Sequence, residues 1–205
     1  MHDFAASLLW FDYLGLAVFA ATGALAAARR RHDVVTFAAF AILTGIGGGT
    51  LRDLLIGAPV FWVHSGQYLF VCVGVALAVW IAGERPWRNS ALLWLDAVGL
   101  AAYAAIGAAK GLSYGVAAPV AVAMGVLTAT FGGILRDVFA GEPSVLLRRE
   151  IYITAALLSA TVYVVARLFD ADPILAGVAA FAAGFALRAG AIRYGWTLPG
   201  FDSDR

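Results

Sequence analysis

Charged residues divide this 205-residue chain into long hydrophobic segments. A helix needs about 20 predominantly apolar residues to cross the hydrocarbon core of a bilayer, with a range of about 17–25. The third, sixth and seventh segments are shorter, so they need tilt or a thin bilayer to span it. The pattern therefore predicts an all-α, polytopic membrane protein with seven transmembrane helices, at Leu8–Ala28, Val34–Leu51, Gln67–Ala82, Ala91–Ala109, Gly115–Leu135, Ile151–Ala166 and Pro173–Leu187.

The composition narrows the class of protein further. Hydrophobic residues make up 62% of the chain and charged residues 13%, whereas soluble domains have about 45–50% and about 25%. Such low charge argues against a soluble enzyme and a disordered chain, and a net charge of +1 leaves no basic face for nucleic acid. The single Cys72 excludes an intrachain disulfide, and His2, His32 and His64 lie far apart. We therefore expect no enzymatic activity, no cofactor and no bound metal.

The arginines predict the orientation in the membrane. Basic residues concentrate in the cytoplasmic loops of membrane proteins. With the N-terminus outside, the outer loops hold only Arg52, Lys110 and Arg167. The C-terminus then lies in the cytoplasm, and the inner side carries Arg29, Arg30, Arg31, Arg85, Arg88, Arg148, Arg149, Arg188, Arg193 and Arg205.

An internal repeat emerges when the chain is shifted by 84 residues against itself. Asp12 then falls on Asp96, and Gly-Gly-x-Leu-Arg-Asp-x-x-x-Gly-x-Pro at 48–59 falls on the same pattern at 132–143. Each copy holds three spanning segments, an odd number, so the two copies enter the membrane from opposite sides. We predict one membrane domain over residues 1–205, with repeats at about 8–83 and 91–169. The extra helix at about 173–193 is expected to serve packing or assembly.

Glycines cluster in the second and fifth segments of this repeat. Glycine destabilises a helix interior by about 1 kcal/mol relative to alanine, so a cluster needs a reason. One reason is close helix packing, and the other is a break or kink whose freed carbonyls face a water-filled path. Because an Arg-Asp pair follows the glycines in both copies, we expect a break that lines a pore. The glycines concerned are Gly47, Gly48, Gly49, Gly132 and Gly133.

Charged residues at membrane depth are the candidate functional groups. Arg52-Asp53 and Arg136-Asp137 follow the glycines, and Asp12 and Asp96 lie at matching depths in the first and fourth segments. We expect ion pairs Asp12–Arg52 and Asp96–Arg136, one near each mouth of a central path. Each mouth would hold two carboxylates and one guanidinium, a net charge of −1 that attracts cations. The alternative is that these side chains reach out of the interface into water.

The repeated motifs resemble those of a known family. The chain reads Gly-Gly-Gly-Thr-Leu-Arg-Asp at 47–53, followed by Pro59-Val60-Phe61-Trp62. The second copy reads Gly-Gly-Ile-Leu-Arg-Asp-Val-Phe-Ala-Gly-Glu-Pro at 132–143, followed by Leu-Arg-Arg-Glu-Ile-Tyr at 147–152. In these motifs the chain resembles the prokaryotic branch of the TRIC family, the trimeric intracellular cation channels, over about residues 8–193.

The resemblance implies a homotrimer in the cytoplasmic membrane, with a separate pore for K⁺ and Na⁺ in each subunit, surrounded by membrane lipids. The pore would be kinked at the glycines of the second and fifth helices. Lys110, the only lysine, lies where animal channels carry a basic residue linked to voltage dependence, which implies a gating role. Proteins with this repeat have also been catalogued as glycine transporters, so a secondary transporter of a small solute such as glycine is the alternative.

Overall fold

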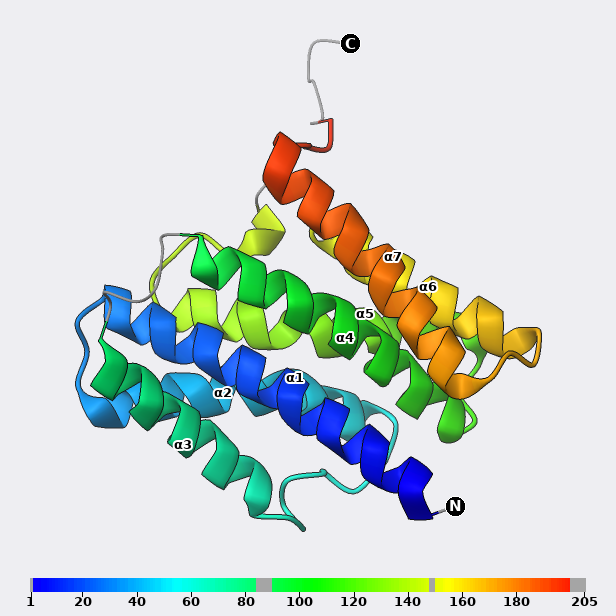
Figure 1. Cartoon of the computed structure of the whole chain (residues 1–205), viewed down its shortest axis with the longest axis horizontal. Coiled ribbons are helices and arrows are strands. Elements are labelled where there is room, and N and C mark those ends of the chain that lie inside the picture. The colour runs from blue at the N-terminus through cyan, green and yellow to red at the C-terminus, as the bar shows by residue number, and fades with distance from the viewer. Residues whose placement is uncertain (1, 84–89, 148–149, 200–205) are drawn as a thin grey trace.

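The structure, a computed structural model, describes the backbone of residues 2–83, 90–147 and 150–199. Side chains are described from residue 12 onward within those ranges, apart from Leu146. Over these residues the chain forms seven α-helices and one short 3-10 helix, η1 (Val145–Leu147) (Figure 1). The α-helices are α1 (His2–Arg29), α2 (Val34–Leu55), α3 (Gln67–Ala82), α4 (Ala91–Ser113), α5 (Ala118–Phe139), α6 (Ile153–Leu168) and α7 (Pro173–Tyr194).

The all-α membrane fold predicted from the hydrophobic segments is confirmed. Among the described helices, α2, α4, α5 and α7 are long and apolar enough to cross a membrane, and α3 and α6 are apolar helices of 16 residues each. The seventh apolar segment was expected at 173–187 within a helix reaching about residue 193, and α7 runs to Tyr194. The charge of Arg188 does not end the helix, because Arg188 is only 2% exposed and ion-paired inside the fold.

Local sequence signals explain several helix ends. Asp33 caps α2 by accepting a hydrogen bond from the Thr36 backbone N–H at 2.8 Å, and this bond lowers the pKa of Asp33. The side chain of Asp172 caps α7 in the same way, immediately before Pro173 at the first helical position. At the other end of α7, Gly195 adopts a left-handed conformation with φ of 69°.

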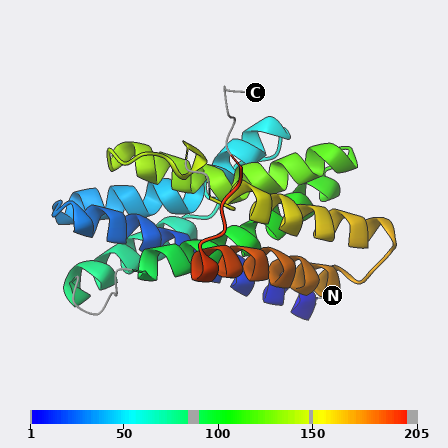
Figure 2. The same ribbon diagram turned by 90° about the horizontal axis from the view of Figure 1, so that it is seen from above.

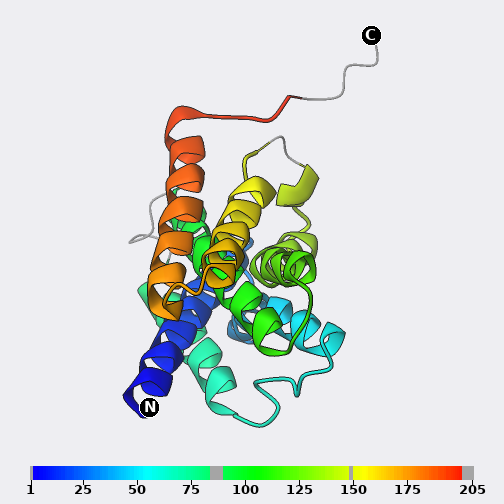
Figure 3. The same ribbon diagram turned by 90° about the vertical axis from the view of Figure 1, so that its right-hand side faces the viewer.

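The helices run roughly along one common direction, as the view from above shows (Figure 2). At the centre α2 packs against α5, while α1 packs on α2 and α3, and α4 packs on α5 and α6. Figure 3 shows α3 on one side of the bundle and α6 with α7 on the other. One hydrophobic cluster lies mainly within α1–α3 and a second mainly within α4–α7. This arrangement brings the C-terminal ends of α2 and α5, which carry the Arg-Asp pairs, to opposite ends of the bundle (Figure 1).

Part of the evidence for membrane orientation lies beyond the described residues. Arg85, Arg88, Arg148, Arg149 and Arg205 are outside them, as is the side chain of His2. The placement of the N-terminus outside the cell therefore stays a prediction.

Candidate functional site: two polar cavities at opposite ends of the bundle

Two cavities lie among the helices, one beside each copy of the Arg-Asp motif. The Asp12 cavity has a volume of about 150 Å³ and reaches Thr44 and Thr128 in the middle of α2 and α5. The Asp96 cavity has a volume of about 240 Å³ and is lined by Arg136 together with charged residues of α1, α7 and the segment after α5. The two cavities place polar groups at both ends of the same helix bundle.

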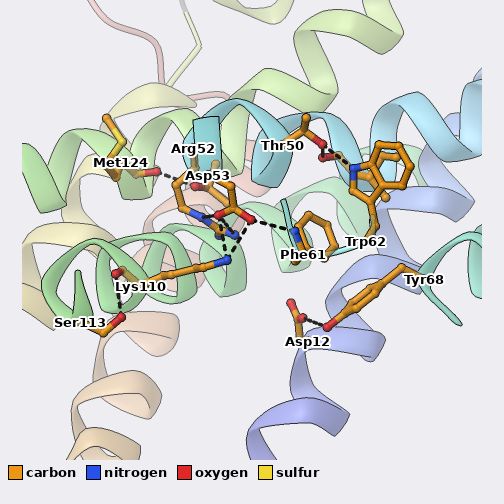
Figure 4. Close-up of polar contacts among 12 residues, drawn as sticks. Asp12, Thr50, Arg52, Asp53, Phe61, Trp62, Tyr68, Lys110, Ser113 and Met124 are labelled. Carbon is orange, nitrogen blue, oxygen red and sulfur yellow. Dashed lines mark hydrogen bonds and ion pairs between the residues drawn. The ribbon is translucent and has the colours of Figure 1, made fainter. Parts of the chain in front are cut away.

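Asp53 organises the charges beside the Asp12 cavity (Figure 4). Its side chain is fully buried and forms ion pairs with Arg52 Nη2 at 2.8 Å and with Lys110 Nζ at 2.8 Å. The Phe61 backbone N–H donates to Asp53 Oδ2 at 3.1 Å, and the Trp62 indole N–H donates to Thr50 at 2.9 Å. These bonds fold the Pro-Val-Phe-Trp segment back against α2. One carboxylate of α2 therefore neutralises two cations and anchors a loop.

Asp12 has a different partner from the one expected. Its Oδ2 accepts a hydrogen bond from Tyr68 Oη at 2.9 Å, and its backbone carbonyl accepts one from Tyr103 Oη at 3.1 Å. The expected Asp12–Arg52 ion pair is wrong, because the guanidinium of Arg52 is held by the adjacent Asp53 through Nε and Nη2, both at 2.8 Å. Asp12 is therefore paired with α3 rather than with α2.

The expected ion pair at the opposite end is confirmed. Arg136 Nη1 lies 2.6 Å from Asp96 Oδ1, and Arg136 Nη2 lies 2.9 Å from Asp137 Oδ1. Asp137 also accepts a hydrogen bond from the Val145 backbone N–H at 3.0 Å, just as Asp53 accepts one from residue 61, which is 84 positions earlier. Arg136 reaches further, to the hydroxyl of Thr22 at 3.2 Å. One guanidinium thus serves two carboxylates here.

Burial distinguishes these groups from interfacial charges. Arg52 is 4% exposed, Asp96 3% and Arg136 5%. Side chains that reached out into water would be far more exposed, so the alternative of interfacial charges is wrong for these residues. Buried charges at membrane depth persist only when they are paired and are typical of ion or substrate pathways.

The expected charge of −1 at each mouth is not what the structure shows. At the Asp12 cavity, Lys110 joins Arg52 and balances the two carboxylates. At the Asp96 cavity, further charges of both signs line the wall. They balance as well, with Arg29, Arg30, Arg136 and Arg188 against Asp96, Asp137, Glu142 and Glu150. Neither cavity therefore attracts cations through a net negative charge. The positions of individual charged groups along its wall matter instead.

The central glycines pack two helices together instead of breaking them. Both α2 and α5 are continuous α-helices through the glycine clusters, so neither helix is interrupted there, and the expected kink stays a prediction. A Cβ on Gly48 would lie 2.1 Å from the carbonyl oxygen of Thr128, and a Cβ on Gly132 would lie 2.2 Å from that of Thr44. No side chain fits at either position, so these glycines let the backbones of α2 and α5 touch between the two cavities.

The remaining glycines of the clusters also face close neighbours. A Cβ on Gly47 would lie 2.7 Å from the Leu135 side chain, and a Cβ on Gly49 would lie 2.7 Å from the ring of Phe61. Gly133 faces the charged cluster, where its Cβ would lie 3.0 Å from the hydroxyl of Tyr152. Each glycine therefore makes room for a particular group.

Some residues of the site were not identified from the sequence. Tyr68 and Tyr152 lie beside Asp12 and Asp96, and their separation of 84 positions was a usable signal. Thr44 and Thr128 share the same separation, and the buried Thr44 hydroxyl has no hydrogen-bond partner. Arg188 had no such signal because α7 lies outside the repeat.

Arg188 changes the role expected of α7. Its Nη2 lies 2.7 Å from Glu150 Oε2, its Nη1 donates to the Ile151 carbonyl at 3.3 Å, and its guanidinium lies 5.1 Å from the centre of the Tyr152 ring. The helix therefore does more than pack, because it contributes a buried cation to the Asp96 cavity.

Among the described residues, no three His, Cys, Asp or Glu side chains are placed to hold a metal ion.

Comparison with known proteins gives consistent relatives. The family model described as Glycine transporter matches residues 9–84 and again residues 93–167. A UPF0126 membrane protein of Vibrio cholerae is 38% identical over 202 residues, which cover 95% of this chain and 83% of that protein. The UPF0126 inner membrane protein YadS of Escherichia coli K12 is 36% identical over 199 residues, covering 95% and 96%.

Solved structures agree with the sequence relatives. The TRIC trimeric intracellular cation channel orthologue from Rhodobacter sphaeroides is 48% identical and superposes with a TM-score of 0.89, covering 92% of this chain and 98% of that one. A prokaryotic TRIC channel crystallised in 0.5 M KCl is 29% identical with a TM-score of 0.84, covering 95% and 100%. With its helices, its paired Arg-Asp motifs and these relatives, the chain belongs to the prokaryotic branch of the TRIC channel family.

Proposed function

We propose that this protein conducts monovalent cations, K⁺ and Na⁺, through a path within each subunit of a homotrimer. The observation that carries the proposal is the pair of polar cavities at opposite ends of one helix bundle, with buried charges at membrane depth between lipid-facing helices. The similarity to TRIC cation channels, at 48% identity to one of them, supports the same function.

The path runs between the two repeats, residues 8–83 and 91–169, with the helix at 173–193 beside them. From the Asp12 cavity a cation meets the carboxylate of Asp12, the unpaired hydroxyl of Thr44 and the glycine-rich faces of α2 and α5. Such oxygen ligands replace part of the hydration shell of a cation. Where α2 and α5 touch at Gly48 and Gly132, the two cavities are separated, which corresponds to a closed conformation.

Conduction is tested by reconstitution into planar bilayers under a KCl gradient, where discrete unitary currents are expected. The Thr44→Val variant is nearly isosteric and removes a hydroxyl that has no hydrogen-bond partner. It should therefore lower unitary conductance without unfolding the protein. Thr161→Val, on an exposed face of α6, is the matched control and should leave conductance unchanged. Absence of unitary currents, or equal conductance in both variants, would contradict the proposed path.

Membrane orientation and assembly are tested separately. We propose the cytoplasmic membrane, with the N-terminus outside and the C-terminus in the cytoplasm, consistent with the inner-membrane relative YadS. Ser90 and Ser113 flank the two ends of α4 and are exposed. In a Cys72→Ala background, Ser113→Cys should react with an impermeant thiol reagent from outside and Ser90→Cys should not. Crosslinking in detergent should yield trimers as the largest product.

A second function is favoured by one observation at the Asp12 cavity. Its lining combines a carboxylate, Asp12, with the cations Arg52 and Lys110, and a small zwitterion such as glycine carries the complementary pair of charges. The Glycine transporter family model matches both repeats. A secondary transporter would give saturable glycine uptake into proteoliposomes without unitary currents, so uptake and current recordings on one preparation separate the two functions.

A further inference from the structure

Two buried tyrosines occupy matching positions at the two ends of the bundle. Tyr68 lies at the start of α3 and Tyr152 directly before α6, and the two are 84 positions apart. Tyr68 Oη donates to Asp12 at 2.9 Å. Tyr152 is 1% exposed, yet its hydroxyl has no hydrogen-bond partner. A buried hydroxyl without a partner is rare in folded proteins and calls for an explanation.

The two arginines bind different partners at the two ends of the bundle. At the Asp96 end, Arg136 holds the aspartate at 2.6 Å and the tyrosine is unpaired. At the Asp12 end, the tyrosine holds the aspartate and Arg52 has turned to its neighbour Asp53. Each aspartate thus has one of two partners, and the structure contains one example of each pairing.

The groups at the Asp96 end are close enough to exchange. The position of a Cβ on Gly133 would lie 3.0 Å from Tyr152 Oη, 3.6 Å from Arg136 Nη2 and 3.7 Å from Asp96 Oδ1. Three polar groups therefore surround one glycine, whose missing side chain leaves them room. A larger residue there would separate the tyrosine from the aspartate.

We propose that Asp96 and Asp12 are two-position switches, each alternating between an ion pair with arginine and a hydrogen bond from tyrosine. The arginine state places a guanidinium across the path, as Arg136 does between Asp96 and the Thr22 hydroxyl. The tyrosine state withdraws the guanidinium to the adjacent aspartate. The exchange of partners stands on the geometry, whereas its role in opening the path rests on the proposed function.

The exchange leaves each charged group with a hydrogen-bond or ion-pair partner. When Arg136 releases Asp96, it keeps Asp137, to which Nη2 and Nε already bind at 2.9 and 3.0 Å. Asp96 then gains the hydroxyl of Tyr152, which lacks a partner in the arginine state. One ion pair is therefore replaced by one charge-assisted hydrogen bond, the kind of bond that Tyr68 already donates to Asp12 at the other end.

Helix α7 biases the switch at the Asp96 end. Arg188 holds residues 150 and 151 and lies 5.1 Å over the ring of Tyr152, in a cation–π contact. At the Asp12 end the tyrosine packs edge-on against Phe61, with ring centroids 4.6 Å apart, and also against Tyr13. The two tyrosines are thus held by different neighbours, which gives each end its own preferred state.

The test uses a single thiol in the path and does not depend on current recordings. In a Cys72→Ala background, Thr44→Cys places a thiol in the Asp12 cavity, and Ag⁺, an ion of similar size to K⁺, is added from one side of oriented membrane vesicles. Thiols left unreacted are counted with a maleimide after unfolding. Tyr152→Phe removes the alternative partner of Asp96. It should therefore slow the reaction from the Asp96 side by about tenfold, the effect of about 1.4 kcal/mol. Tyr163→Phe, which changes a buried tyrosine within α6, is the control and should not change the rate.

Three further variants define the switch. Arg136→Gln removes the competing partner, so it should speed the reaction from the Asp96 side, and adding Tyr152→Phe to it should have no further effect. Tyr68→Phe should slow the reaction from the Asp12 side only. Equal rates in Tyr152→Phe and Tyr163→Phe, or a slowing by Tyr152→Phe that persists without Arg136, would overturn the switch. Switching of thiol reactivity in a protein that carries no current would refute the channel and leave the switch intact.

Discussion

The contact between α2 and α5 makes the sharpest prediction about stability. In Gly48→Ala the new methyl group would lie 2.1 Å from the Thr128 carbonyl oxygen, and in Gly132→Ala it would lie 2.2 Å from that of Thr44. Both neighbours are backbone atoms, so the helices must move apart. Overpacking of this kind destabilises by about 1–3 kcal/mol, and the better helix propensity of alanine offsets at most about 1 kcal/mol. Each substitution should therefore lower stability by about 1–2 kcal/mol.

The measurement is the midpoint of thermal unfolding in detergent, followed by size-exclusion chromatography after heating. For a chain of this length, 1 kcal/mol corresponds to about 2–4 °C, so each variant should unfold roughly 2–8 °C lower. Gly74→Ala in α3 and Gly177→Ala in α7 make the same chemical change where nothing lies within 4 Å. These controls should keep the midpoint or raise it. Midpoints for Gly48→Ala and Gly132→Ala that match the controls would refute the packing role of the glycines.

Further substitutions test the charged groups. Asp53→Asn leaves two cations without their carboxylate and should lower the free energy of unfolding by about 3–5 kcal/mol. Asp12→Asn removes one hydrogen-bonded carboxylate and should lower it by about 1 kcal/mol. Equal thermal midpoints for the two variants would contradict this ranking. Lys110→Gln removes a cation that is 25% exposed, so it should lower the free energy of unfolding by less than about 1 kcal/mol. It should also change the unitary current at one voltage polarity. Unchanged current at both polarities would show that Lys110 does not line the path. Arg188→Gln should lower the thermal midpoint, while the exposed Arg193→Gln should not; equal midpoints would contradict the buried role of Arg188.

The repeat made much of the site predictable. A shift of 84 residues aligned Asp96 with Asp12 and Arg136 with Arg52, which placed an aspartate and an arginine at the same depth at each end. That argument was sufficient for Asp96 and Arg136, which form the expected pair. It failed for Asp12 because depth does not decide between competing partners. Arg52 and Arg136 each bind the adjacent aspartate through two nitrogens, but only Arg136 also reaches the aspartate of α4 through its third.

Reading charges as the ends of membrane segments was the other source of error. Arg188 was taken to end the seventh segment, yet it lies inside α7 with Glu150 as its partner. Likewise α2 and α5 continue past their Arg-Asp pairs to Leu55 and Phe139. A charge ends a spanning helix only when it must reach water, and a partner on another helix removes that need. Such a partner is fixed by tertiary packing, which a single hydrophobicity profile does not contain.

One sequence difference between the repeats contributes to the unlike states of the two ends. Lys110 lines the Asp12 cavity, and the residue 84 positions before it, Ala26, lines the Asp96 cavity. At the Asp12 end two cations are available, both bind Asp53, and Asp12 is left to a tyrosine. At the Asp96 end an alanine takes the place of the lysine, Arg136 serves both carboxylates, and the hydroxyl of Tyr152 stays unpaired. A duplicated motif thus yields two different ends because the cations that reach each carboxylate differ.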